Sequence, residues 1–95
     1  MKTVNDIKIY RDELRESITN ETVEVRKEIL RDEVFTLDRV LGMFNGGVPL
    51  TQFEIFELLQ TEQRKKVANP DYPSNHAEVK IVAAVKAYQW VLASK

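Results

Sequence analysis

The sequence predicts an all-α protein, a small single-domain helical bundle of three to four helices with one long central helix. Apolar residues recur at three- and four-residue spacing through most of the 95 residues, which is the period of an amphipathic helix. Glycine and proline, which interrupt helices, are confined to the stretches GMFNGGVP and NPDYP. A chain of this length buries one core, so residues 1–95 are expected to form a single domain.

The first helix is expected at about residues 5–18. Thr3 or Asn5 can cap its first turn, and the ITNET stretch ends it. Arg11 shares the apolar stripe of this helix, whereas Tyr10 lies at its flank. The apolar members of the stripe are Val4, Ile7, Leu14 and Ile18.

The long central helix is expected at about residues 21–44, with Asn20 as its cap. The Asn45-Gly46-Gly47 trio is interpreted as its C-terminal cap, because glycine enters the left-handed conformation freely, and Pro49 prevents continuation. A phosphate-binding loop is the less favoured interpretation of these glycines, since no strand precedes them and no GK[ST] follows.

Two further helices are expected at about residues 52–68 and 76–94. Thr51 and Glu54 have the spacing of a capping box, in which each side chain bonds the other residue's backbone amide. Asn75 follows the NPDYPS loop and has the same form of N-terminal signature. Short connections would make neighbouring helices antiparallel, as in a bundle.

Composition excludes several classes of function. The 14 basic and 15 acidic residues give a net charge of -1, so duplex DNA is an unlikely partner. No cysteine is present, which excludes disulfides and thiolate metal sites and is compatible with a cytoplasmic location. The charged N-terminal region lacks the apolar core of a signal peptide, and no apolar run approaches the ~20 residues of a membrane span. We therefore expect no membrane partner.

The sequence contains no catalytic signature. HExxH, paired ExxH and nucleophile-elbow patterns are absent, and carboxylates fall near lysine or arginine on helix faces. The lone His76 is interpreted as a solvent-exposed residue of a helix start rather than a general base or ligand. We expect a non-enzymatic protein with no catalytic residue, no cofactor and no metal.

Two charges interrupt the apolar face of the long helix. Arg26 and Glu33 are seven residues apart and share the arc of Leu37 and Phe44. One interpretation is that each finds a partner at the rim of the core or across a subunit contact. The other is that Arg26, with Lys27, faces an anionic ligand.

The last helix is apolar around most of its circumference. Its polar residues Glu78, Lys86 and Gln89 occupy one narrow strip, and Lys80 stands alone on the opposite side. Its alanines would let another helix approach closely. Self-association is the favoured explanation, and the alternative is that this helix is the central helix of the bundle. The expected interface combines this helix with the apolar residues of the third helix: Phe53, Phe56, Ala83, Ala87 and Trp90.

The run Ile7-Lys8-Ile9-Tyr10-Arg11-Asp12 resembles the opening of the small helical phage proteins that sequester cyclic nucleotides of the bacterial CBASS defence system. In that family a tyrosine of this run and a lysine of the following helix contact the cyclic dinucleotide, and the protein is a homo-hexamer. The resemblance implies Tyr10 and Lys27 as ligand contacts, and a homo-oligomer.

Three hypotheses of function follow. The first is a protein-binding module, such as an inhibitor, adaptor or assembly factor, that self-associates. The second is a phage-type protein that sequesters a cyclic nucleotide between protomers, with tyrosine stacking on a base and cations meeting phosphates. Its candidate ligand-binding residues are Tyr10, Arg11, Arg26 and Lys27. Helix-turn-helix DNA binding is disfavoured, because the third helix opens with Gln52, Phe53 and Glu54.

Overall fold

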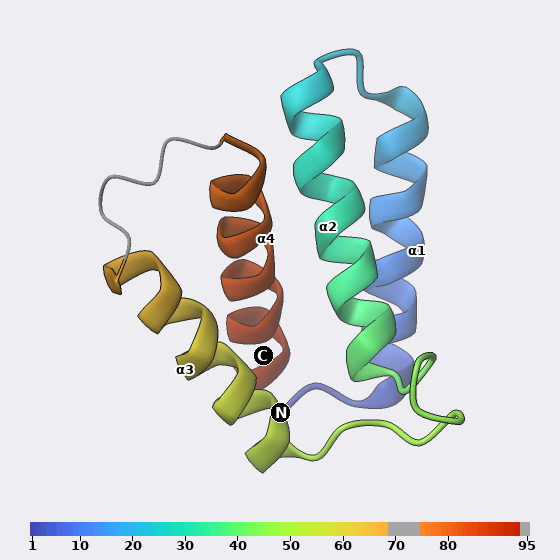
Figure 1. The fold of residues 1–95 in the computed structure, drawn as a ribbon. Coiled ribbons are helices and arrows are strands. Elements are labelled where there is room, and N and C mark those ends of the chain that lie inside the picture. The colour runs from blue at the N-terminus through green and yellow to red at the C-terminus, as the bar shows by residue number, and fades with distance from the viewer. Residues whose placement is uncertain (69–74, 94–95) are drawn as a thin grey trace.

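The computed structural model describes residues 1–68 and 75–93, without the side chains of residues 66–68 and 75–77. It contains the helices α1 (Val4–Asn20), α2 (Glu24–Val40), α3 (Gln52–Ala68) and α4 (Asn75–Leu92), and the described residues form no strand (Figure 1). The predicted all-α fold is confirmed. The helices are 17, 17, 17 and 18 residues long, so the expected single long helix is not formed.

α2 and α4 form the middle of the bundle. α2 packs on both α1 and α4, and α4 packs on both α2 and α3. The N-terminal residues run to the C-terminal end of α4, as Figure 1 shows. There the Lys2 N–H donates to the Val91 carbonyl at 2.8 Å, and Lys2 Nζ donates to the Ala93 carbonyl at 2.8 Å. These bonds place the start of α1 beside α4.

Two alanines of α4, Ala83 and Ala87, are buried inside the chain. Ala83 is 0% exposed and Ala87 is 1% exposed. Both were expected to contact a second copy, but the chain's own helices already cover them. Small side chains let helix axes approach closely, so α2 and α3 can pack against α4. The remaining core is apolar and comes from all four helices; its most buried members include Ile7, Leu37, Ile55 and Val91.

The predicted capping box at the start of α3 is confirmed. The Glu54 N–H donates to Thr51 Oγ1 at 3.2 Å, and the Thr51 N–H donates to Glu54 Oε1 at 3.0 Å. The second of these bonds lowers the pKa of the Glu54 carboxyl. Thr3, one of two caps expected for α1, forms the same reciprocal pair with Asp6. The starts of α1 and α3 are therefore encoded locally.

The start of α2 differs from the prediction of residues 21–44. α1 continues to Asn20, so this residue is helical and does not cap α2. Val23 is the N-cap and makes no side-chain capping bond. The Glu21 carboxylate, outside either helix, accepts hydrogen bonds from the amides of Thr22 and Val23, both at 3.1 Å. These bonds satisfy amides of the turn between α1 and α2.

The end of α2 is set by Gly42 rather than by the Asn45-Gly46-Gly47 trio. Gly42 has φ +84°, and a Cβ at this position would lie 2.1 Å from the carbonyl oxygen of Val48. The Leu50 N–H then donates to the Val40 carbonyl at 2.9 Å and closes the turn. Gly46 and Gly47 also have positive φ, but they lie in the turn that follows the end of α2 at Gly42.

Alanine substitutions at two of these glycines separate close packing from backbone strain. Gly46→Ala should lower the free energy of unfolding by about 1 kcal/mol, the cost of a Cβ at positive φ. Gly42→Ala should lower it by at least about 3 kcal/mol, because the Val48 carbonyl must also move. Urea denaturation measures both. Equal losses for the two variants would contradict the assignment of Gly42 as the helix end.

Candidate functional site

Arg11 forms an ion pair within the chain. Its Nη1 lies 3.1 Å from Oδ1 of Asp38 on α2, and both side chains are mostly buried. Arg15, one turn later on α1, reaches the other oxygen of Asp38 at 3.4 Å. Arg11 is therefore part of the α1–α2 contact.

Arg26 and Lys27 lie at the other end of the α1–α2 pair. Lys27 Nζ is 3.8 Å from the carboxylate of Glu24, one turn earlier, and Arg26 is exposed. Arg26 precedes Asp38, the partner of Arg11, by twelve residues, which is about 18 Å along the helix axis. One chain does not bring these two cations to Tyr10. A site that includes all four predicted residues requires more than one copy.

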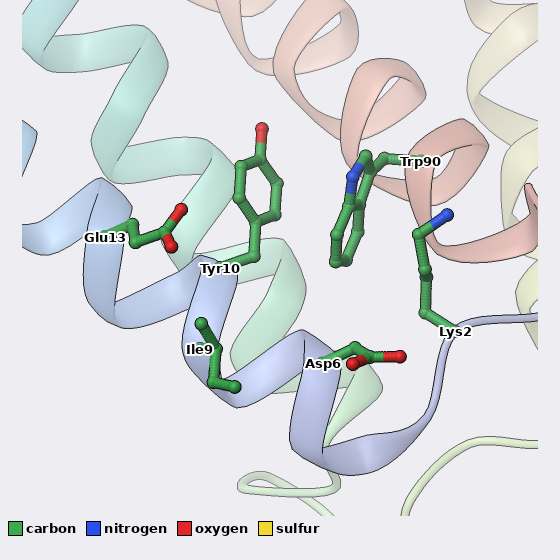
Figure 2. A pocket seen from close by; sticks show the side chains of 6 residues that line it. All are labelled: Lys2, Asp6, Ile9, Tyr10, Glu13 and Trp90. Atoms are coloured by element: carbon green, nitrogen blue, oxygen red, sulfur yellow. The ribbon is translucent and has the colours of Figure 1, made fainter. Parts of the chain in front are cut away.

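Tyr10 instead meets Trp90 of α4. The ring centroids are 4.2 Å apart and the planes are inclined by 31°. Lys2 Nζ lies 5.0 Å from the centroid of the Trp90 ring, a cation–π distance. Figure 2 shows Glu13, Tyr10, Trp90 and Lys2 as successive layers across the space between α1 and α4. Trp90, expected at an interface between copies, thus has a partner within the chain.

These side chains line a groove of about 400 Å³ between α1 and α4. Its lining residues are Lys2, Asp6, Ile9, Tyr10, Glu13 and Trp90 (Figure 2). Sequence reasoning missed Lys2, Asp6, Ile9 and Glu13. The spacing of Asp6 and Glu13 could have pointed to the groove. Residues at positions i, i+3, i+4 and i+7 share one face of a helix, so both carboxylates lie on the same face as Tyr10. No sequence spacing connects Tyr10 to Trp90, because that contact depends on how the helices pack.

Glu33, one of the two charged residues on the apolar face of α2, has a charged partner on α4. Its side chain is 1% exposed, and its Oε1 lies 3.4 Å from Nζ of Lys86 on α4. Oε2 has no hydrogen-bond partner. Burial raises the pKa of the Glu33 carboxyl, and the Lys86 charge opposes that rise. Burial also raises the pKa of the Tyr10 hydroxyl, and the nearby Glu33 charge adds to the effect. The charge therefore belongs to an ion pair at the rim of the core.

The charges of the groove disfavour a phosphate ligand. Two carboxylates, of Asp6 and Glu13, line it against the single ammonium of Lys2. A phosphate would meet a net negative lining, whereas a cationic group would be attracted. The ring pair adds a cation–π contact for a cationic group and offers no such contact to a phosphate.

The described residues show no other site of recognisable chemistry. They hold no group of three or more His, Asp or Glu side chains that could bind a metal ion. The side chain of His76 lies outside the described part of the chain. None of the helices, over the portions described, is long and apolar enough to cross a bilayer. No family model, curated protein or solved structure matches this chain.

The Glu33–Lys86 pair predicts a pH-dependent stability. Because the native pKa of Glu33 is raised above its ordinary value of 4.5, its contribution to stability is complete below that pH and is lost as pH rises through the raised pKa. Glu33→Gln should therefore unfold with a free energy on the order of 1 kcal/mol higher than wild type at pH 7, and equal to it near pH 4.

Lys86→Met is the complementary variant. It should be less stable than wild type by about 1 kcal/mol at pH 7, a modest loss because Lys86 is 64% exposed and screened by water. This loss should disappear near pH 4, where Glu33 is neutral. Urea denaturation at the two pH values measures both variants. A Glu33→Gln difference that is constant with pH would contradict the buried charge.

Proposed function

We propose that this protein is a non-enzymatic binding protein that works through protein–protein contacts and self-associates. The observation that carries the proposal is a group of exposed apolar side chains at the end of α2, here called the aromatic corner. Phe35 is 49% exposed, and the three residues of the following turn are 60–61% exposed. The aromatic corner consists of Phe35, Met43, Phe44 and Val48.

The aromatic corner is ordered by the chain itself. The rings of Phe35 and Phe44 are 4.9 Å apart between centroids, and the guanidinium of Arg39 lies 5.5 Å from the Phe35 ring. The close approach of Gly42 to Val48 fixes the turn that carries the other members. A preformed apolar surface loses little conformational entropy when it binds, and large exposed apolar patches are typical of interaction sites.

A second copy of this chain is the occupant that the aromatic corner fits. The corner contains no carboxylate, and the guanidinium of Arg39 lies over the Phe35 ring. Two copies related by a twofold axis can therefore bring their phenyl rings together without burying an unpaired charge. Phe53 and Phe56, predicted as interface residues, are also exposed and add apolar surface at the start of α3.

Sequestration of a cyclic nucleotide between protomers is the alternative. The run Ile7–Asp12 and the ring of Tyr10 support it, and the carboxylates of Asp6 and Glu13 beside that ring count against a phosphate there. The protein-binding proposal has the stronger support, because it uses side chains that the fold leaves exposed. An inhibitor, adaptor or assembly factor would use the same surface.

Phe44→Asp tests the aromatic corner. In light scattering coupled to size exclusion, we expect wild type to form an oligomer at about 100 μM and the variant to be monomeric, since the interface would bury an unpaired carboxylate. The matched control is Val25→Asp, which places the same charge at an exposed apolar position ten residues before Phe35. It should leave the oligomer intact.

Circular dichroism should show the same helix content in all three proteins, because both positions are exposed. A wild-type monomer at every concentration would overturn self-association. Equal disruption by Val25→Asp would show that the aromatic corner is not the interface.

A further inference from the structure

We propose that the groove between α1 and α4 binds a linear polyamine, an alkyl chain with an ammonium group at each end. The groove presents a carboxylate near each end and an aromatic pair between them. This site is separate from the aromatic corner and does not depend on the proposed self-association.

The two carboxylates of the groove lie on the same face of α1. Asp6 and Glu13 are seven residues apart on α1, so they share one face of the helix and lie about 10 Å apart along its axis. Ile9 and Tyr10 lie between them, and the Trp90 ring stacks on Tyr10 (Figure 2). An alkyl chain with terminal ammonium groups matches this order of anionic, apolar and anionic surface.

Lys2 shows that an alkylammonium group fits against these rings. Its Nζ lies 5.0 Å from the Trp90 ring centroid and donates to the Ala93 carbonyl. Trp90 in turn stacks on Tyr10, and the side of Tyr10 away from Trp90 faces Glu13 (Figure 2). Among the described residues no cation pairs with the Glu13 carboxylate. On the Trp90 side of the ring pair the Lys2 ammonium is in place, whereas on the Tyr10 side the Glu13 carboxylate could bind a second ammonium from a ligand.

The buried carboxylate of Glu33 adds to the negative potential at this end. It is 1% exposed with Oε2 unbonded, and it lies close enough to Tyr10 for its charge to act on the hydroxyl. Lys86 offsets part of this charge from the surface side. Asp6 keeps one oxygen for a ligand, because its hydrogen bond from the Thr3 amide uses only Oδ2.

Trp90 is the only tryptophan in the chain, so its fluorescence reports on the groove directly. Titration with spermidine in 150 mM NaCl should give a saturable change in emission. Glu13→Gln should weaken binding about three- to fivefold, the effect of one exposed ion pair. The matched control Glu16→Gln removes a carboxylate one turn further along α1 that does not line the groove, and it should bind like wild type. Lys2→Met should bind more tightly, because it removes the competing ammonium.

Two ligand controls complete the experiment. Propylamine, with one ammonium, should bind at least about tenfold more weakly than spermidine, because it cannot reach both carboxylates. Mg²⁺ at equal ionic strength should leave the emission unchanged. A linear, unsaturated response, equal effects of Glu13→Gln and Glu16→Gln, or an equal response to Mg²⁺ would each overturn the polyamine site. All variants are checked by circular dichroism for unchanged helix content.

Discussion

The fold depends on covering α4, a helix that is apolar around most of its circumference. The chain does this itself: α2 packs on one side of α4 and α3 on another, and the alanines that line these contacts are fully buried. α1 packs on α2 and meets α4 through the Tyr10–Trp90 ring pair. The groove lies beside this ring pair, because the N-terminal residues and α1 reach α4 at its C-terminal end.

Two surfaces of different chemistry remain after α4 is covered. The aromatic corner is apolar and nearly free of charge, which suits contact with a protein. The groove is small and carries an excess of carboxylate over ammonium, which suits a cationic small molecule. They lie at different places in the bundle: the corner forms at the end of α2, whereas the groove lies between α1 and α4.

Local features of the fold could be predicted from the sequence, and contacts between distant residues could not. The Thr51 capping box depends on four consecutive residues, so its spacing alone predicts the start of α3. The end of α2 depends on the approach of Val48 to Gly42, and three glycines were equally permissive. Periodicity predicts that the face of Ala83 is buried, but it does not say whether the same chain or another covers it. The Tyr10–Trp90 contact could not be predicted for the same reason, because it depends on how α1 and α4 pack.

Hydrogen exchange of the α4 amides tests most directly the claim that a single chain covers α4. Because α2 and α3 of the same chain bury Ala83 and Ala87, the amides of residues 83–91 should be among the most protected. In the Phe44→Asp variant, which is expected to be monomeric, their protection should be the same at about 5 μM and about 500 μM protein. Protection that falls on dilution would show that another copy covers α4, and would contradict the account.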